Sequence, residues 1–258
     1  MESGIKGKTA VLSGAARLSG LGHAFCKGLA AEGVNIVVVD IEDGSEAVAA
    51  LQALGVDAMY VRTDVAEQSE VEVLKQAVEQ RFGGCDILVH AASPFPSHNL
   101  DEMAFEEWKL VTNVNLDGLY LLAHAFLPGM KARGWGRIIP ISSTTYHAGI
   151  GGRTHYVAAK AGMIGFTRSL AREVGDFGVT VNVLAPGLVR TQGAAESHVE
   201  DAVFAGEDPY AIIRDQQCIR KTLVPDNLVG PLVFLASTQS SYITGQAILV
   251  DAGWQHVG

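Results

Sequence analysis

Short apolar runs alternate with longer stretches of helical periodicity along the whole chain. The apolar runs contain no regular polar positions, which is typical of parallel strands buried on both faces. We predict seven such strands: Thr9–Ser13, Asn35–Asp40, Ala58–Arg62, Ile87–Ala91, Arg137–Ser142, Thr180–Ala185 and Ala247–Val250. Helices are expected between them, including His23–Glu32, Glu67–Phe82, Phe105–Lys131, His155–Val174 and Asp226–Ser237. This alternation predicts a doubly wound α/β sheet of about seven parallel strands with helices on both faces.

No linker or repeat interrupts the pattern, so we expect residues 1–258 to form one domain. The segment 190–218 departs from it, because glycines and charges there are mixed with scattered apolar residues such as Phe204 and Tyr210. A long insertion in a compact domain is usually functional, and this one leaves the sheet edge where ligands bind. We therefore predict a lid over the site; the alternative is a surface excursion with one short helix.

A glycine-rich turn follows the first strand and opens a helix, as in Rossmann-type domains. Glycines permit a tight turn and let backbone N–H groups approach a pyrophosphate at the helix N-terminus. We therefore expect a dinucleotide to contact Gly14, Arg17, Gly20, Leu21 and Gly22.

The second strand ends in Asp40, eighteen residues beyond Gly22. A carboxylate at this position can accept hydrogen bonds from the adenosine ribose, and it repels a 2′-phosphate. The sequence therefore favours NAD (NADH) over NADP as the cofactor. Arg17 instead favours NADP, since a basic side chain in this turn could reach such a phosphate.

Tyr156 and Lys160 lie four residues apart on a predicted helix, which places the phenol and the ammonium on one face. A nearby cation lowers the pKa of a phenol toward a useful acid–base range. Ser143 ends the fifth strand, thirteen residues before Tyr156, where its hydroxyl could hold a carbonyl or alcohol oxygen. Together with the glycine turn, these residues indicate a dehydrogenase.

With its Ser143, Tyr156 and Lys160 spacing, the chain resembles the short-chain dehydrogenase/reductase family over essentially its whole length. The resemblance implies that Tyr156 exchanges the substrate proton, Lys160 binds the nicotinamide ribose, Ser143 orients the substrate and Asn115 anchors a relay water. It also implies cofactor contacts at Asp64, Val65, Ala91, Pro186, Gly187, Val189 and Thr191.

Two features depart from the family pattern. Five residues separate Gly14 from Gly20, where three are usual. This spacing resembles the divergent enoyl-reductase branch, whose catalytic Tyr and Lys lie seven residues apart. Because Tyr156 and Lys160 keep the four-residue spacing, we favour carbonyl and alcohol chemistry. The second departure is 90–93, His-Ala-Ala-Ser, where the family commonly has Asn-Asn-Ala-Gly, and it leaves the local packing open.

The stretch 135–156 further resembles bacterial 1-phenylethanol-type dehydrogenases, which suggests an aromatic, cyclic or otherwise bulky secondary alcohol. Residues expected to line an apolar substrate pocket are Pro94, Phe95, Tyr146, His147, Phe204 and Tyr210. Two alternatives remain: a 3-oxoacyl thioester reductase, expected to prefer NADPH, and a non-catalytic dinucleotide-binding sensor.

Charge and composition narrow the range of partners. There are 19 basic and 28 acidic residues, so the net charge of −9 disfavours nucleic acid and anionic membranes as partners. No metal motif is present, and the three widely spaced cysteines fit a reducing cytoplasm. We expect a cytoplasmic enzyme that acts on a small molecule, and the resemblance implies a homotetramer or homodimer.

Overall fold

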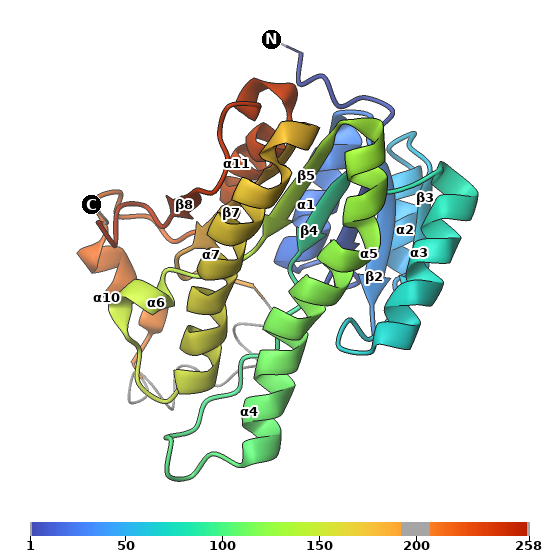
Figure 1. Cartoon of the computed structure of the whole chain (residues 1–258). Helices are drawn as coiled ribbons and strands as arrows, with labels where there is room; N and C mark the ends of the chain where they lie inside the picture. The colour runs from blue at the N-terminus through green and yellow to red at the C-terminus, as the bar shows by residue number, and fades with distance from the viewer. Residues whose placement is uncertain (1, 192–206, 257–258) are drawn as a thin grey trace.

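A six-stranded parallel sheet forms the centre of the computed structural model, which describes residues 2–191 and 207–256 (Figure 1). The strand order is β3-β2-β1-β4-β5-β6, and two further strands pair as β7-β8. Their bounds are β1 Thr9–Ser13, β2 Asn35–Asp40, β3 Ala58–Arg62, β4 Ile87–His90, β5 Gly136–Pro140, β6 Val179–Val181, β7 Val183–Pro186 and β8 Ala247–Val250. The prediction of a doubly wound α/β fold is confirmed.

The predicted sixth strand, Thr180–Ala185, is divided into β6 and β7, so the described residues form eight strands instead of the expected seven. The division falls at Asn182, whose side chain donates to Ile243 O at 2.7 Å and accepts from Gln246 N at 3.1 Å. These bonds turn the chain from its pairing with β5 toward β8. Asn182 is a single polar residue inside an apolar run, so the periodicity predicted one continuous strand.

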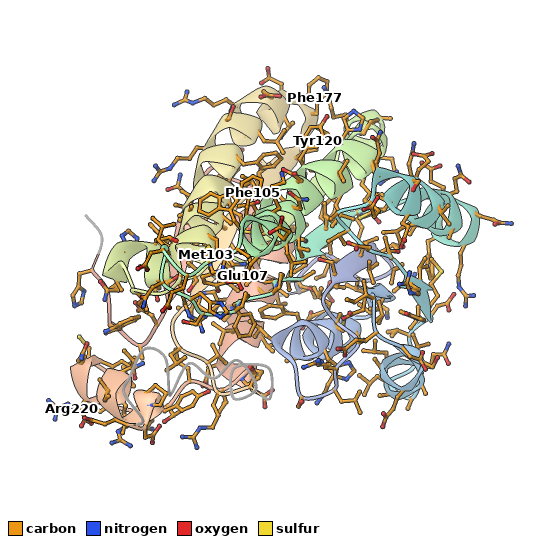
Figure 2. The ribbon with its side chains drawn as sticks, turned by 90° about the horizontal axis from the view of Figure 1, so that it is seen from below. Met103, Phe105, Glu107, Tyr120, Phe177 and Arg220 are labelled. Atoms are coloured by element: carbon orange, nitrogen blue, oxygen red, sulfur yellow. The ribbon has the colours of Figure 1, made fainter. Side chains whose placement is uncertain are left out.

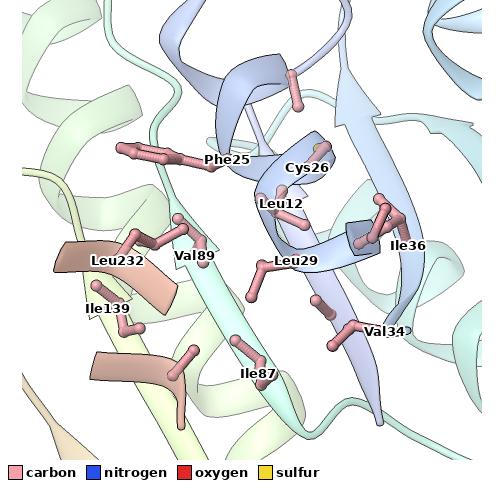
Figure 3. Packing of buried hydrophobic residues seen from close by; sticks show 14 of the residues in the cluster. Leu12, Phe25, Cys26, Leu29, Val34, Ile36, Ile87, Val89, Ile139 and Leu232 are labelled. Carbon is pink, nitrogen blue, oxygen red and sulfur yellow. The ribbon is translucent and has the colours of Figure 1, made fainter. Parts of the chain in front are cut away.

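Three helices cover each face of the sheet. On one face lie α1 Leu21–Ala31, α2 Ser45–Gln52 and α11 Asp226–Ala236; on the other lie α3 Gln68–Phe82, α5 Gly118–Arg133 and α7 Thr154–Val174. Successive strand residues point to opposite faces. Leu12 therefore packs under α1 with Phe25 and Leu29, whereas Val11 belongs to the cluster on the opposite face (Figure 3).

The predicted helix Phe105–Lys131 contains an interruption. It consists of α4 Phe105–Thr112, a π-helical turn at Asn113–Asp117, and α5. Such turns often occur at functional sites, and this one buries Asn115 completely. Three described α-helices fall outside the helix ranges predicted above: α2, α6 Thr145–Ala148 and α10 Pro209–Gln216. The last lies at the end of the proposed lid segment, where the alternative interpretation expected one short helix.

Two aromatic side chains are exposed on the helices that flank the π-helical turn (Figure 2). The exposed fraction is 69% for Phe105 of α4 and 53% for Tyr120 of α5. No helix in the described ranges is long and apolar enough to cross a membrane. An exposed aromatic surface on neighbouring helices is a candidate protein interface.

Candidate active site

A cavity of about 730 Å³ opens at the carboxyl ends of the strands, beside the switch point between β1 and β4. It brings together most of the residues that we predicted from the sequence. Those that line it are Gly14, Arg17, Gly20, Leu21, Gly22, Asp40, Asp64, Val65, Ala91, Pro94, Phe95, Ser143, Tyr156, Lys160, Pro186, Gly187, Val189 and Thr191.

Two glycines of the turn after β1 lie too close to neighbouring backbone atoms to carry a side chain. Gly14 has φ +72°, and a Cβ on it would lie 2.6 Å from Ala92 N. A Cβ on Gly22 would lie 2.2 Å from Gly14 O, so both positions require glycine. The longer gap between Gly14 and Gly20 forms a loop before α1 begins at Leu21, and a pyrophosphate fits at this helix N-terminus.

Asp40 lines the cavity at the end of β2. Its carboxylate accepts from Ala16 N at 3.1 Å and from Glu42 N at 3.2 Å. A carboxylate has about four acceptor positions, so capacity remains for ribose hydroxyls. Arg17, the residue that could favour a 2′-phosphate, forms a two-pronged ion pair with Glu42 at 2.7 and 2.5 Å.

Tyr156 and Ser143 both line the cavity, and the Ser143 side chain is close enough to lower the pKa of the Tyr156 phenol. Burial raises the pKa of the phenol, and the Ser143 side chain and the Arg153 charge oppose that rise. Lys160 was expected to lower the Tyr156 pKa, but Arg153 is the cation that does so here. This pairing puts a proton donor and an orienting hydroxyl at one point of the cavity.

Lys160 is 2% exposed, and its Nζ lies 5.3 Å from the centre of the Tyr156 ring. Nζ donates to Ile141 O at 2.7 Å, which anchors the side chain against the end of β5. Loss of hydration lowers the pKa of this ammonium to about 7. Lys160 is not among the groups that shift the pKa of Tyr156, whereas its charge contributes to lowering the pKa of His90.

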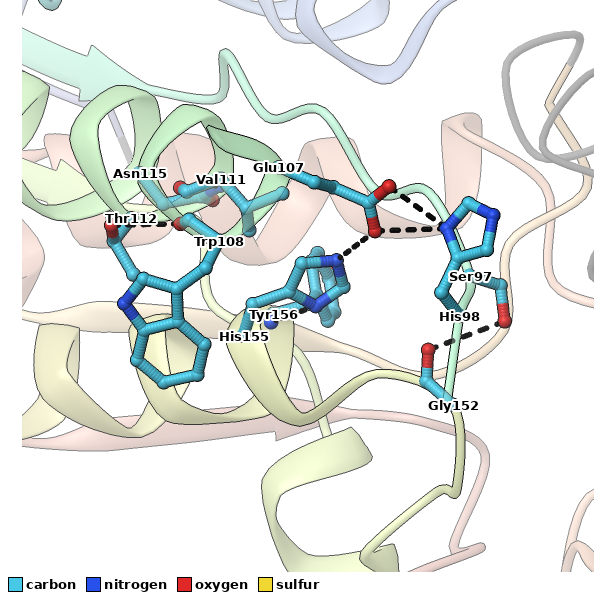
Figure 4. Close-up of polar contacts among 10 residues, drawn as sticks. All are labelled: Ser97, His98, Glu107, Trp108, Val111, Thr112, Asn115, Gly152, His155 and Tyr156. Atoms are coloured by element: carbon cyan, nitrogen blue, oxygen red, sulfur yellow. Dashed lines mark hydrogen bonds and ion pairs between the residues drawn. The ribbon is translucent and has the colours of Figure 1, made fainter. Parts of the chain in front are cut away.

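Asn115 is fully buried and does not line the cavity, and its role as the anchor of a relay water stays a prediction. Its Nδ2 donates to Val111 O at 2.9 Å (Figure 4), and its Oδ1 accepts from Ser93 Oγ at 2.8 Å. The π-turn directs the side chain into the protein interior, and the backbone carbonyl of Asn115 lies 3.1 Å from His90 Nε2.

His90 settles the packing of 90–93 that the sequence left open. Its Nε2 faces the carbonyls of Val114 and Asn115, both at 3.1 Å, so this nitrogen carries the proton. Nδ1 then accepts from Ser13 Oγ at 2.8 Å. Burial lowers the pKa of His90 to about 3, so the imidazole is neutral at physiological pH.

A carboxylate, Glu107, joins two histidines beside Tyr156 (Figure 4). His155 is fully buried; it accepts from Tyr156 N at 2.8 Å through Nδ1 and meets Glu107 Oε1 at 3.1 Å through Nε2. His98 lies 2.8 Å from Glu107 Oε2. The contacts join α4, the start of α7 and the loop after β4. Local pattern could not predict this cluster, because Glu107 is 48 residues from His155 and 9 from His98 in the chain.

Three of the predicted pocket residues do not line the cavity. Tyr146 packs against the cluster of Ile164 and Val183, and His147 is exposed with its ring 3.7 Å from that of Tyr146. Tyr210 is buried beneath Arg190, 4.6 Å away. In each case the short helix carrying the residue turns it away from the cavity. Phe204 lies outside the described residues.

The described end of the proposed lid, α10, contributes Ile213 to the cavity wall. Trp254, from the segment after β8, lines it as well. Arg153 is a third residue that sequence analysis missed. It is the N-cap of α7, and its position three residues before Tyr156 was an available signal.

Comparison with known proteins agrees with this geometry. A family model described as enoyl-(acyl carrier protein) reductase matches residues 14–255. The 3-oxoacyl-(acyl-carrier-protein) reductase FabG of Escherichia coli (strain K12) is 34% identical over 96% of this chain and 97% of its own. D-xylose 1-dehydrogenase of Caulobacter vibrioides (strain NA1000 / CB15N) is 34% identical, with 97% of each chain covered. D-beta-hydroxybutyrate dehydrogenase of Cupriavidus necator is 32% identical over 97% of this chain and 98% of its own.

Two solved structures share the fold across the whole chain. L-sorbose reductase from Gluconobacter frateurii, complexed with NADPH and L-sorbose, has a TM-score of 0.91 at 32% identity and full coverage of both chains. A gluconate 5-dehydrogenase from Burkholderia cenocepacia J2315, in complex with NADP and tartrate, has a TM-score of 0.89 at 29% identity, covering 98% of this chain and 97% of its own. The chain therefore belongs to the short-chain dehydrogenase/reductase family and is an oxidoreductase acting on CH–OH or keto groups.

Proposed function

We propose that this protein interconverts a secondary alcohol and a ketone with NAD(H). The observation that carries the proposal is Asp40, whose carboxylate lines the adenosine half of a cavity that contains Ser143 and Tyr156 in its other half. A 2′-phosphate placed beside this carboxylate would meet charge repulsion. The solved neighbours are described with NADPH and NADP, which favours the phosphorylated cofactor, so the choice of NAD rests on Asp40 alone.

In the proposed reaction a bound nicotinamide supplies or accepts the hydride. Ser143 holds the substrate oxygen, and Tyr156 gives that oxygen a proton in reduction or removes one in oxidation. Lys160 is held at the Ile141 carbonyl, within reach of a ribose bound in the cavity. The protein therefore contributes orientation and proton transfer.

The substrate class is less closely constrained. Relatives at 32–34% identity are named for a thioester, a sugar and a hydroxy acid, and none of those named above is an aryl-alcohol dehydrogenase. The expectation of an aromatic alcohol thus rests on the resemblance of 135–156 and on the apolar wall that includes Pro94, Phe95 and Ile213. We propose a substrate with an apolar body, with or without a ring.

A second candidate is reduction of a 3-oxoacyl thioester, because several FabG proteins of that activity are among the relatives, including one at 36% identity from Pseudomonas aeruginosa. The four-residue spacing of Tyr156 and Lys160 favours keto reduction over the enoyl reduction that the family model's description names. A sensor without activity is disfavoured, because the catalytic residues Ser143, Tyr156 and Lys160 all line one cavity.

One experiment tests both proposals. Purified protein is titrated with NADH and NADPH, and then assayed with each cofactor on aryl ketones, alicyclic ketones and acetoacetyl-CoA. Tighter NADH binding with turnover of simple ketones supports the first proposal. Tighter NADPH binding contradicts the NAD assignment, and turnover restricted to the thioester supports the second candidate.

A further inference from the structure

Arg153 brings a positive charge into the substrate half of the cavity, next to Tyr156. The residue is 5% exposed, and its guanidinium carbon lies 5.9 Å from the centre of the Tyr156 ring and 5.7 Å from that of Phe95. Arg153 is also the N-cap of α7, and its carbonyl accepts from Val157 N at 2.8 Å. The helix that carries the catalytic phenol therefore also holds the backbone of Arg153.

Among residues 2–191 and 207–256, no carboxylate forms an ion pair with this guanidinium. Its Nε and Nη2 are buried and have no hydrogen-bond partner within the described part of the chain. The carboxylates that line the cavity, Asp40, Glu42 and Asp64, belong to the adenosine half. Burial without a partner lowers the pKa of Arg153. A buried positive charge is energetically unfavourable unless a ligand supplies the opposite charge and accepts its hydrogen bonds.

We propose that Arg153 binds a carboxylate of the substrate, so that the enzyme acts on a hydroxy acid and the corresponding oxo acid. The planar guanidinium presents paired N–H donors that match the two oxygens of a carboxylate. Its closeness to Tyr156 places that carboxylate within a few bonds of the reacting carbon. The inference rests on the proposed alcohol–ketone function and names its substrate class.

The carboxylate of such a substrate takes no part in the redox reaction. The hydroxy acid loses a hydride to NAD⁺ and a proton to Tyr156, and the oxo acid forms with its carboxylate unchanged. A 3-oxoacyl thioester carries no charge at that point, so it leaves Arg153 unpaired. A preference for substrates with a free carboxylate therefore distinguishes the alcohol–ketone function from thioester reduction.

The test compares oxo acids with their methyl esters, which keep the carbon skeleton and remove the charge. Pyruvate, acetoacetate and benzoylformate, each beside its methyl ester, place the carboxylate one or two bonds from the ketone and vary the apolar body. The variants are Arg153→Met and Arg153→Lys, and the control is Arg172→Met, a change at an exposed position of the same helix. Folding is checked by circular dichroism.

We expect the wild-type enzyme to have a kcat/KM about 100-fold higher for at least one acid than for its ester, the usual loss when a buried charge pair is broken. Arg153→Met should remove this preference by lowering the value for the acid about 100-fold more than the value for the ester, because loss of the cation beside Tyr156 affects both substrates alike. Arg153→Lys should restore part of it, and Arg172→Met should leave it intact. Equal use of acid and ester by the wild type, or a preference that survives Arg153→Met, overturns the proposal.

Failure of the proposed function gives a different result. If no ketone is reduced, calorimetric titration of benzoylformate and its ester into the enzyme–NADH complex still measures recognition of the carboxylate. Binding of the acid alone, lost in Arg153→Met, supports the inference; equal or absent binding of both contradicts it. The comparison in wild-type protein needs no variant, so a misfolded Arg153→Met protein leaves the test valid.

Discussion

Ser93 Oγ donates a 2.8 Å hydrogen bond to Asn115 Oδ1, joining the loop after β4 to the π-helical turn. The family commonly has glycine at the Ser93 position, so this chain uses a side chain to hold Asn115. A second bond, from Asn115 Nδ2 to Val111 O, gives the nitrogen of the same side-chain amide a partner too. Together they fix the backbone of the turn and so the carbonyl that also receives His90 Nε2.

Replacing Ser93 by alanine should therefore destabilise the protein. The change leaves Asn115 Oδ1 buried without a donor, which costs about 1–3 kcal/mol of unfolding free energy. Urea denaturation measures the loss. Ser169→Ala, at an exposed serine of α7, is the control and should change the free energy by less than about 0.5 kcal/mol. Equal effects of the two changes would show that Ser93 does not support the turn.

Tyr156→Phe should abolish most turnover and leave NADH binding intact. The variant lacks the phenolic proton, and loss of a positioned acid–base group lowers kcat by about 10²–10⁴-fold. Steady-state assays and fluorescence titration with NADH provide the two readouts. Tyr242→Phe, at a fully exposed tyrosine, serves as the matched control. Undiminished turnover in Tyr156→Phe would disprove the assigned proton donor.

Asp40→Ser should shift the cofactor preference toward NADPH. Removing the carboxylate deletes charge-assisted bonds to the ribose and the repulsion of a 2′-phosphate, so we expect NADH affinity to fall about 10-fold or more. The additional change Glu42→Gln should increase NADPH affinity further, because it releases Arg17 from its ion pair. Dissociation constants for both cofactors measure these effects. Glu46→Gln, in the first turn of α2, is the control; an unchanged preference in Asp40→Ser would contradict the NAD assignment.

His90 should make the protein less stable as the pH falls. The unfolded chain protonates this side chain near pH 6.5, whereas the folded protein does so only near pH 3. Between these values the unfolded state binds more protons, so the stabilisation present above pH 6.5 is lost by about 1.4 kcal/mol per pH unit. Urea denaturation across this range should show a shallower dependence for His90→Asn. Identical slopes in both proteins would refute a neutral buried His90.

Exposed aromatic residues on α4 and α5 should mediate self-association. We propose a homotetramer or homodimer in which Phe105 and Tyr120 are covered by another subunit, because each exposes more than half of its surface here. Phe105→Ser combined with Tyr120→Ser should produce smaller particles in sedimentation velocity experiments. Leu54→Ser, at another exposed apolar position, should leave the size unchanged. A monomeric wild-type protein would contradict the proposal.

Local periodicity was sufficient to predict most of the strands, because a buried parallel strand must be apolar along its whole length. β1, β2, β3 and β8 begin and end at the predicted residues. Most cofactor-binding positions were predictable for a related reason: the glycine turn and Asp40 follow their strands directly, and parallel strands bring such segments to one sheet edge. Asn182 and the π-turn were not predictable, because each depends on bonds to distant segments.

The substrate half of the cavity was decided by tertiary structure. Short helices rotate Tyr146, His147 and Tyr210 away from the cavity, and periodicity cannot specify the direction of so short an element. The lowered pKa of Lys160 depends on burial by segments remote in sequence, and so does the lack of a hydrogen-bond partner for Arg153 Nε and Nη2 among the described residues. The reaction type could therefore be predicted from the spacing of Ser143, Tyr156 and Lys160. Substrate recognition could not, because desolvation and ion pairing depend on which side chains surround a residue in the folded protein.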